Sequence, residues 1–510
     1  MDLTGSSIVA GQVRKTAGAE FYSYNPSNGE RLQPAFKEAG ADLVDLAVTA
    51  AERDFVAFRQ LPHSRRALFL EAVAEQLRVI EDQLVGRANA ETGLPQARLQ
   101  GELTRSVNQL LMFADFIRDG AFLQTQVTPA LPDRQPLSRP DLRRTEVPIG
   151  PVAVFGASNF PLAFSVAGGD TAAAFAAGCP VIVKGHPAHP GTCELVGRAI
   201  VAALEQCGLP RGIFSLLQGG SHQLGAELVT HPLLRAVAFT GSYAGGKALF
   251  DIAAQRLEPI PVFAEMGSVN PVFLLPQALI EGSDSLASGY AESVTLGVGQ
   301  FCTNPGLLFA PEGPELERFV SAVVEHLGNL GAGVMLHAGI KQNYHSALET
   351  LTVQPGVERL SVSAASSVAG GCLATPALLR TTGERFLANP LIAEEVFGPA
   401  AVIVACSSRQ QQLQCAERLR GQLTATVHAA AAEAAPCQEL FSILERKAGR
   451  LIYNGFPTGV EVCPAMIHGG PFPATTDSRT TSVGTEAIRR FLRPVCWQNA
   501  PPEILPPELR

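Results

Sequence analysis

The sequence lacks the run of ~18 consecutive apolar residues that a membrane-spanning helix needs. Its opening segment, Met1–Ser7, contains neither a basic stretch nor an apolar one, so no secretory signal is visible. Basic residues are also scarce, since 39 Lys and Arg stand against 47 Asp and Glu and the formal net charge is −8. A nucleic-acid surface would need a basic patch. We therefore expect a cytoplasmic protein with no membrane and no nucleic-acid partner.

Paired cysteines are absent as well. None of the 10 cysteines forms a C-x-x-C pair, so neither a metal site nor a disulfide framework is indicated, and we predict no metal. Scattered cysteines in a chain of this length usually behave as small buried apolar residues. A cysteine with a chemical role must therefore be recognised by its neighbours in the sequence.

The first part of the chain reads as helical. The 510 residues exceed what one compact core holds, so two or three domains are expected. Apolar residues at three- and four-residue spacing predict helices over Ser64–Leu84 and Gln100–Phe116. The proline-rich stretch Pro129–Pro140 is typical of a connector, and Leu142–Val147 of an exposed strand.

From Pro151 onward, short apolar runs alternate with Ala-rich helical stretches, which predicts an α/β fold with a parallel sheet covered by helices. Such sheets bind ligands at the carboxyl ends of their strands. Asn159, Lys184 and Gly241-Ser242 each lie at or just past a strand end. The predicted strands are Val152–Phe155, Val181–Lys184, Ile213–Leu217, Ala236–Thr240 and Ile260–Ala264, and the helices are Gly168–Ala177, Cys193–Cys207, His222–Thr230 and Tyr243–Arg256.

A second α/β segment is expected from Asn270 to about Gly455. The run Ala429–Ala435 is typical of low-complexity helix, and Glu486–Trp497 ends in an alternating pattern that suits an exposed strand. Exposed strands invite aggregation unless they are paired, and association of subunits is one way to pair them. Further helices are predicted over Ser283–Leu296 and Leu316–Leu327.

One cysteine stands in an unusual setting. Cys302 lies within Gly297–Gly306, where glycines before and after it free the backbone to approach a ligand and Pro305 ends regular structure. A nucleophilic cysteine needs such a setting, because its thiolate must be reached and its backbone N–H exposed.

Two further residues could act with this thiol. Glu265 ends an apolar strand next to a glycine, and in a cleft its carboxylate could deprotonate a thiol or a water. Asn159 lies in the turn after the first parallel strand, where its amide could donate to a developing oxyanion. Each is more often structural when it occurs alone. Together, a thiol, a base and an oxyanion donor indicate chemistry at a carbonyl carbon.

The order of several motifs resembles that of the aldehyde dehydrogenase superfamily, and the match covers about residues 20 to 500. The motifs are Asn159-Phe160-Pro161, Phe239–Ser242, Glu265-Met266-Gly267, Gly299–Cys302 and Glu394–Pro399. The resemblance implies a cytosolic NAD- or NADP-dependent enzyme that acts on a small-molecule aldehyde, with a Rossmann-type cofactor domain, an α/β catalytic domain and a small strand-exchange region. It also implies a homodimer or homotetramer. The implied parts are residues 1–138 with 151–270 for the cofactor, 271–484 for catalysis, and 139–150 with 485–510 for oligomerisation.

The resemblance assigns a role to each candidate residue. Cys302 would attack the aldehyde, Glu265 would activate the hydrolytic water, and Asn159 with the Cys302 backbone N–H would form the oxyanion hole. On the cofactor side, the implied residues are Lys184, Gly241, Ser242, Gly246, Glu395 and Phe397. The spacing of Gly241, Ser242 and Gly246 replaces the G-x-G-x-x-G fingerprint, and the helix that follows would face the pyrophosphate.

Many NAD-preferring relatives carry a glutamate three residues after the lysine, whereas this chain has Pro187 there. A carboxylate at that place would repel a 2′-phosphate and Lys184 would attract one, so we expect NADP to be used at least as well as NAD. His186, His189, Arg211 and His222 are candidate phosphate neighbours.

The segments Lys184–Thr192 and His468–Arg479 resemble α-ketoglutaric semialdehyde (2,5-dioxopentanoate) dehydrogenases and their NADP-linked, fatty-aldehyde-oxidising relatives. An acidic semialdehyde and a longer apolar aldehyde both stay open as substrates, and no arginine can be assigned to a substrate carboxylate.

His468 is interpreted as a loop anchor, with a catalytic base as the alternative. A CoA-acylating enzyme and a catalytically silent relative are the remaining alternatives, and the retained Glu265 and Cys302 speak against them. Phe160, Phe164, Phe301 and Phe456 are expected to line the substrate pocket.

Overall fold

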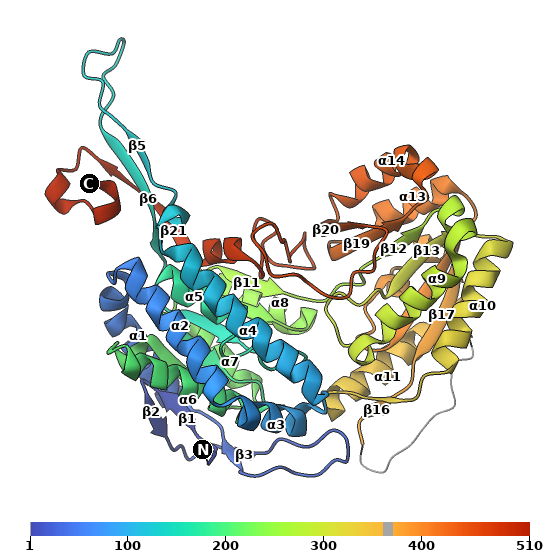
Figure 1. Ribbon diagram of the computed structural model, residues 1–510, viewed down its shortest axis with the longest axis horizontal. Helices are drawn as coiled ribbons and strands as arrows, with labels where there is room; N and C mark the ends of the chain where they lie inside the picture. The colour runs from blue at the N-terminus through green and yellow to red at the C-terminus, as the bar shows by residue number, and fades with distance from the viewer. Residues whose placement is uncertain (1, 361–370) are drawn as a thin grey trace.

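The strand–helix alternation after residue 151 builds a sheet in which five neighbouring strands run parallel, as predicted (Figure 1). The computed structural model describes residues 2–360 and 371–510. The strand order is β11-β10-β7-β8-β9-β1-β2, and the last two strands, which the sequence pattern did not predict, are antiparallel additions from the N-terminus. The bounds are β1 Ser7–Val9, β2 Gln12–Arg14, β7 Val152–Phe155, β8 Val181–Lys184, β9 Phe214–Leu217, β10 Ala236–Thr240 and β11 Val262–Glu265.

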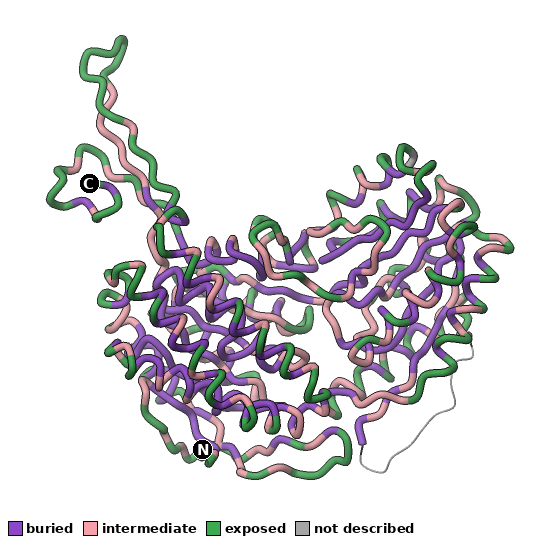
Figure 2. Tube along the Cα trace, viewed as in Figure 1, coloured by how far each residue is buried: buried purple, intermediate pink, exposed green. Residues whose placement is uncertain are grey.

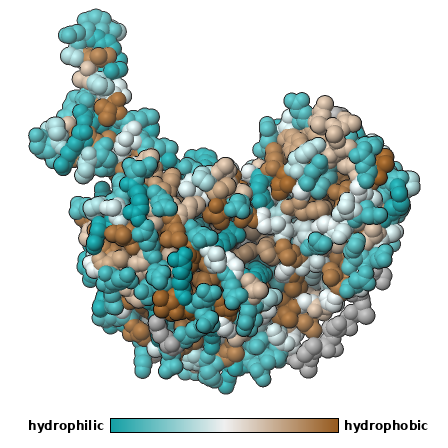
Figure 3. All heavy atoms as spheres, in the orientation of Figure 1, coloured by the Kyte–Doolittle hydropathy of each residue, from teal (hydrophilic) through white to brown (hydrophobic). Residues whose placement is uncertain are grey.

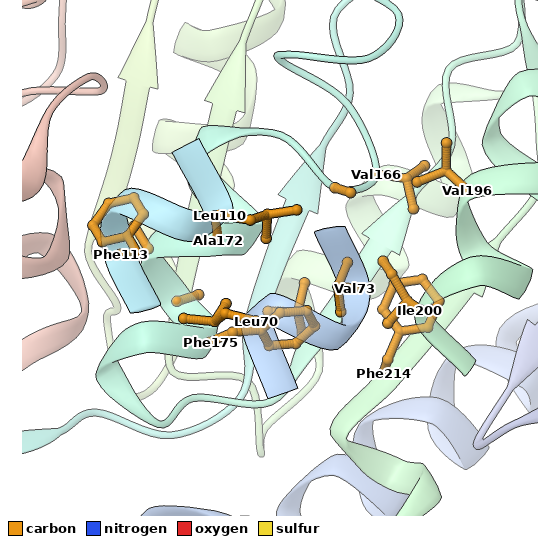
Figure 4. Close-up of a cluster of buried hydrophobic side chains, with 14 of the residues drawn as sticks. Leu70, Val73, Leu110, Phe113, Val166, Ala172, Phe175, Val196, Ile200 and Phe214 are labelled. Carbon is orange, nitrogen blue, oxygen red and sulfur yellow. The ribbon is translucent and has the colours of Figure 1, made fainter. Parts of the chain in front are cut away.

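Alternate side chains of these strands face opposite layers of helices. Val152 and Val154 of β7 pack into a core with α2 to α6, whereas Ala153 and Phe155 pack into a core with α1, α7 and α8. Figure 4 shows part of the first core, with side chains of α2, α4, α5 and α6 meeting over the sheet. The helices are α1 Ala41–Arg59, α2 His63–Val79, α3 Glu81–Thr92, α4 Gln96–Ile117, α5 Gly169–Ala177, α6 Pro190–Gln206, α7 His222–Thr230 and α8 Tyr243–Ala254.

A second seven-stranded sheet, in the order β15-β17-β18-β13-β12-β19-β20, forms the other lobe. Helices α9 and α10 cover one face and α11 to α14 the other, so the strands of both lobes are the most buried parts of the chain (Figure 2). The strands are β12 Val272–Leu274, β13 Leu307–Pro311, β15 Glu358–Leu360, β17 Ala377–Thr382, β18 Ala400–Cys406, β19 Gln422–His428 and β20 Ala448–Tyr453. The helices are α9 Pro276–Thr295, α10 Pro314–Gly328, α11 Ala338–Thr352, α12 Gly383–Ala388, α13 Arg409–Arg418 and α14 Ala434–Leu444.

An arm projects from the first lobe (Figures 1 and 3). It consists of β5 (Gln126–Thr128), β6 (Leu142–Pro148) and β21 (Leu492–Gln498), with β6 antiparallel to both neighbours. The two predicted exposed strands therefore pair with each other within one chain and do not need a second subunit for this. The proline-rich stretch predicted to be a connector instead forms the loop of a hairpin. Residues 129–141 join β5 to β6, with a bridge between Leu131 and Arg139.

Two predicted helices differ from the structure. The first is divided between α2 and α3 at Ile80, whose φ of −104° and ψ of 12° are not helical. The Ala-rich run is not one helix, because Ala429 and Ala430 follow the end of β19 without regular structure and a 3₁₀ turn at Ala431–Glu433 precedes α14. Alanine has the highest helix propensity, but propensity is a weak signal that tertiary context overrides, and here the sheet sets the direction of the chain. None of the described helices is long and apolar enough to cross a membrane.

A buried ion pair fastens the C-terminal segment to the first lobe. Arg490 Nη1 lies 2.8 Å from Asp170 Oδ1 of α5, and the two side chains are only 3% and 8% exposed. Breaking a buried pair leaves one charge without compensation, which typically costs about 3–5 kcal/mol.

We therefore predict that Arg490→Met lowers the melting temperature by several degrees, because Asp170 is left as an unpaired buried carboxylate. Arg493→Met is the matched control, since Arg493 lies three residues away and is exposed, and its melting temperature should equal that of the unmodified chain. Equal melting curves for the two variants, measured by calorimetry, would show that the pair does not hold this segment.

Candidate active site

Cys302 follows a turn whose backbone is strained. Gly297, Val298 and Gly299 have φ values of 58°, 60° and 64°. Such values are costly for a β-branched residue such as Val298, and strain of this kind gathers at functional sites. A Cβ on Gly299 would lie 2.2 Å from the Gly398 carbonyl oxygen, so only glycine fits there. The Asn270 amide holds the turn by donating to the Cys302 carbonyl at 2.8 Å.

The Cys302 thiol lies in a cluster with Glu265 and His468. His468 Nε2 is 3.3 Å from Cys302 Sγ and 2.9 Å from Glu265 Oε1, and the three ligand atoms all lie within 4.8 Å of one another. Glu265 ends β11 in the first lobe, whereas Cys302 follows α9 in the second. The cluster therefore forms where the two lobes meet.

The C-terminal segment carries His468 into this cluster. Residue Thr475 bridges Glu265 along the free edge of β11, and the backbone of His468 is fixed by the Thr481 hydroxyl, which accepts from the His468 N–H at 2.9 Å. Ser482 Oγ donates to Glu265 Oε2 at 2.5 Å. The interpretation of His468 as a loop anchor is therefore incomplete, because its ring lies between the thiol and the carboxylate. In the sequence His468 is followed by two glycines and a proline, and this pattern does not indicate that its ring contacts the thiol and the carboxylate.

The proton of the imidazole can be placed from these contacts. Nε2 faces both Glu265 and Cys302, whereas Nδ1 is buried without a hydrogen-bond partner among the described residues. A proton on Nε2 can be donated, and a proton on Nδ1 cannot. We therefore assign the proton to Nε2.

The pKa values of the acid and the thiol move apart. Burial alone would raise the pKa of Glu265, but His468 and Ser482 outweigh it and the pKa is lowered. The pKa of Cys302 is raised well above its ordinary value, chiefly by burial and then by the charge of Glu265. At neutral pH the carboxylate is therefore ionised and the thiol is protonated, with a hydrogen bond between them.

Asn159 contacts the segment that leads to Cys302. Its amide Nδ2 donates to the carbonyl of Gln300 at 3.0 Å, which places the side chain beside the segment that leads to the thiol. Arg98 of α4 donates to the Asn159 carbonyl at 2.8 Å and lies over the rings of Phe160 and Phe301. The turn after β7 is thus fixed from α4.

The aromatic residues divide into two groups. Phe160 lies 5.4 Å from Phe164 and 5.3 Å from Phe301, between ring centroids. Phe456 packs instead against Tyr290 of α9. Phe456 is therefore partly buried against the core of the second lobe, and its place in the substrate pocket stays a prediction.

The predicted cofactor residues of the first lobe lie along the carboxyl ends of its strands. Ser242 caps α8 by accepting from Gly245 N at 3.2 Å, and the start of this helix is exposed, as an anion site requires. A Cβ on Gly246 would lie 2.7 Å from Met266, and one on Gly241 the same distance from the Phe239 ring, so both glycines permit close packing. These features fit a dinucleotide pyrophosphate.

Lys184 at the end of β8 has an acidic neighbour that the local sequence does not show. Burial lowers the pKa of Lys184 to about 8, while Glu38 and Cys193 act in the opposite direction. The carboxylate of Glu38 also accepts from Ser221, which caps α7. The carboxylate missing three residues after Lys184 thus has a counterpart from the N-terminal segment.

Glu395 and Phe397 come from the second lobe, in the loop before β18. They line a small pocket with Ser268, Gly299 and neighbouring residues. A Cβ on Gly267 would lie 2.1 Å from Glu395 Oε2, so the carboxylate lies directly against the backbone after β11. Burial raises the pKa of Glu395 to about 7. The charge of Glu395 also opposes the ionisation of Cys302 and raises the pKa of that thiol.

The candidate phosphate neighbours are not equivalent. His189 is fully buried, with Nε2 2.9 Å from the Ala157 carbonyl oxygen and Nδ1 3.3 Å from Cys193 Sγ, so it is not available to a phosphate. Arg211 bonds to Glu205 at the surface, and His222 is exposed. His186 is half-buried and stacks on His189.

All ten cysteines lie in the described part of the chain and all are free thiols. Glu265, Cys302 and His468 offer three donor atoms of the types that zinc prefers. His468 Nε2 contacts both the thiol and the carboxylate, so the same three groups can also pass a proton between them.

Comparisons with known proteins agree with this geometry. The model of the "Aldehyde dehydrogenase family" matches residues 13–471. The chain is 51% identical to alpha-ketoglutaric semialdehyde dehydrogenase 2 of Azospirillum brasilense, covering 100% of this chain and 97% of the relative. It is 43% identical to alpha-ketoglutaric semialdehyde dehydrogenase of Acinetobacter baylyi, with 99% and 96% covered. Among solved structures, 1-pyrroline-5-carboxylate dehydrogenase from Thermus with bound NAD matches with a TM-score of 0.82 at 20% identity, covering 97% of this chain and 92% of that one.

We predict that the two neighbours of Cys302 change its reactivity in opposite directions. Glu265→Gln removes a charge that raises the pKa of the thiol, so iodoacetamide should alkylate Cys302 several-fold faster at pH 7.5. His468→Ala removes an N–H that can stabilise the thiolate, so alkylation should slow. Mass spectrometry of the Cys302 peptide measures both rates.

The exposed His326 on α10 supplies the control, and His326→Ala should leave the rate unchanged. Slower alkylation in Glu265→Gln would contradict the proton arrangement described above.

Proposed function

Because the chain belongs to the aldehyde dehydrogenase family, we propose that it oxidises α-ketoglutarate semialdehyde (2,5-dioxopentanoate) to the free dicarboxylic acid. The chain is an NAD(P)-dependent aldehyde dehydrogenase. The choice of substrate is supported by the names of two relatives that match over almost the whole chain. The observation that carries the chemistry is the cluster of Cys302, His468 and Glu265.

We propose that Cys302 is the nucleophile. As Sγ attacks the aldehyde carbon, the thiol proton passes to the carbonyl oxygen, which becomes the hydroxyl of the thiohemiacetal. His468 Nε2–H, 3.3 Å from Sγ, stabilises the developing thiolate. The oxygen of the thiohemiacetal is held by the Asn159 side chain and the Cys302 backbone N–H. The bound nicotinamide supplies the acceptor of the hydride.

We propose that Glu265 then acts as the base for hydrolysis of the thioester. As the hydride leaves, the hydroxyl proton passes to the Glu265 carboxylate, which releases it to solvent. A water then attacks the acyl carbon, its proton passes to the same carboxylate, and the Cys302 sulfur takes up that proton as it leaves and the acid is released. The lowered pKa of Glu265 keeps the carboxylate ionised at neutral pH, which this step requires. This base favours water over CoA as the acyl acceptor.

We propose that the cofactor lies between the lobes, with its pyrophosphate at Gly241, Ser242 and Gly246 and its adenine-side ribose at Lys184. Glu395 and Phe397 would hold the nicotinamide end, which is supported by the effect of the Glu395 charge on Cys302. The corresponding division of the chain is 1–138 with 151–270 for the cofactor and 271–484 for catalysis.

We propose that residues 139–150 and 485–510 mediate a homodimer or homotetramer in the cytoplasm. These segments share an arm with β5 and the loop that follows it, where Val127, Leu131 and Leu137 are 52%, 43% and 73% accessible. Apolar residues on a projecting arm are suited to an interface.

An aldehyde panel tests the substrate. We expect 2,5-dioxopentanoate to give a higher kcat/KM than succinate semialdehyde or octanal, with either cofactor, and to yield the free acid without CoA. Octanal as the best substrate would favour the fatty-aldehyde alternative, and an acyl-CoA formed only when CoA is added would favour the acylating one. Cys302→Ala should abolish oxidation with every aldehyde and leave the Kd for NADP unchanged.

Cofactor choice gives a separate prediction. We expect NADP to bind at least as tightly as NAD at pH 7, and its Kd to rise as the pH passes through about 8, because Lys184 then loses its charge. Glu38→Gln should tighten NADP severalfold relative to NAD, since a carboxylate repels the 2′-phosphate. Fluorescence titration measures both Kd values. A strong NAD preference retained in Glu38→Gln would contradict the role of both residues.

A further inference from the structure

Three charged residues lie on the face of α4 that points toward the catalytic cluster, and two of them have partners. Arg98 donates to the Asn159 carbonyl and lies over Phe160 and Phe301. Glu102 accepts from the backbone N–H groups of Leu162 and Ala163 at 2.8 and 2.9 Å. Both side chains therefore hold the segment that follows Asn159. Arg105, about one turn further along α4, forms no such hydrogen bond through its Nε or Nη2 atom among the described residues.

The guanidinium of Arg105 is partly buried, and two of its three nitrogens lack hydrogen-bond partners among the described residues. Its Nε and Nη2 atoms are both shielded from solvent, and neither has a partner among the described residues. A buried charge without hydrogen bonds is costly, and an arginine cannot escape the cost by losing its proton under ordinary conditions. The site therefore lacks an anionic group that would complete it.

Arg105 faces the reacting atoms. Its Cζ lies 5.4 Å from the centre of the Phe164 ring, which is 6.4 Å from the ring of His468. Its charge acts on Cys302, where it lowers the pKa of the thiol against the effect of burial. The guanidinium and the nucleophile therefore border the same space.

The charges around Arg105 do not neutralise it by contact. Glu102, Glu265 and Glu461 act on it electrostatically, yet none of them forms an ion pair with it within the described residues. Glu102 and Glu265 already accept the hydrogen bonds described above, and Glu461 is exposed. A second cation, Arg450, also acts on Cys302, but it donates to the carbonyls of Pro457 and Gly459 and so holds a loop.

We propose that Arg105 binds the carboxylate of an ω-oxo acid substrate while Cys302 attacks its aldehyde carbon. This inference rests on the proposed function and names the residue that selects the acidic semialdehyde. Four carbon–carbon bonds of ~1.5 Å separate the aldehyde carbon of 2,5-dioxopentanoate from its carboxylate carbon, so the extended molecule spans about 5 Å between them. The planar guanidinium fork suits a carboxylate, and an apolar chain would leave it unpaired.

The consequence is selectivity that depends on charge. The apolar rings of Phe160 and Phe164 would accept the methylene groups of either substrate class. Only a substrate with an anionic end satisfies Arg105. The arginine therefore discriminates against fatty aldehydes by the hydrogen bonds that they fail to make.

The test compares 2,5-dioxopentanoate with pentanal, which has the same chain length and no carboxylate. Arg105→Met should lower kcat/KM for the acid at least tenfold more than for pentanal, whose smaller loss comes from the effect of Arg105 on the pKa of Cys302. Arg105→Lys should fall between, because it keeps the charge and loses the fork. Arg118→Met, at the exposed end of α4, is the matched control and should behave as the unmodified enzyme with both substrates.

A binding measurement separates this inference from the proposed function. Glutarate, a dicarboxylate that cannot react, should bind to the unmodified enzyme and at least tenfold more weakly to Arg105→Met by calorimetry. Equal losses for the acid and pentanal, or equal glutarate affinity in both proteins, would overturn the role of Arg105. An unmodified enzyme that oxidises no aldehyde would instead overturn the proposed function, and the glutarate comparison would still decide whether Arg105 binds carboxylates.

Discussion

A buried carboxylate beside a buried thiol is stable only if donors compensate its charge, and the arrangement of the whole site follows from that requirement. Glu265 receives these donors from His468 and Ser482, which lie more than 200 residues further along the chain. The C-terminal segment must therefore run along the edge of β11, where Thr475 bridges Glu265. The buried pair of Arg490 and Asp170 fixes the end of the same segment to the first lobe.

The two sheets divide the chemistry between them. Parallel strands of the first lobe end at Lys184, Thr240 and Glu265, so their polar residues gather at one edge. The second lobe contributes the strained turn that presents Cys302 and the loop that carries Glu395. Neither lobe contains a complete site, and the pKa shifts of Cys302 and Glu265 arise only where the lobes meet.

Helix α4 adds a third contribution through its buried polar face. Arg98 and Glu102 use their charges to hold backbone near Asn159, which is an ordinary structural use of a buried ion. Arg105 resembles them in sequence and differs in having no partner at Nε and Nη2. The distinction between a structural and a substrate-binding arginine is therefore made by hydrogen bonding and not by residue type.

Much of the fold could be predicted from local patterns. Strands β7, β8 and β10 and helix α7 have the predicted bounds, because an apolar run of four or five residues between turns is a local signal. The limits of such signals are visible at Ile80, where one predicted helix becomes two, and in the arm, whose strands pair with each other. Strands β6 and β21 of the arm pair although they lie about 350 positions apart in the sequence, and no local pattern specifies such a pairing.

The sequence by itself determined the family and the motifs around Asn159, Glu265 and Cys302, because glycines and polar residues at strand ends leave a local record. Tertiary structure alone decided that the ring of His468 lies between the thiol and the acid, that Glu38 accompanies Lys184, and that Phe456 packs against the core of the second lobe. It also separated Arg105 from the other arginines. The reason is physical: burial, unpaired donors and shifted pKa values are properties of groups brought together from distant segments, and they exist only once the chain has folded.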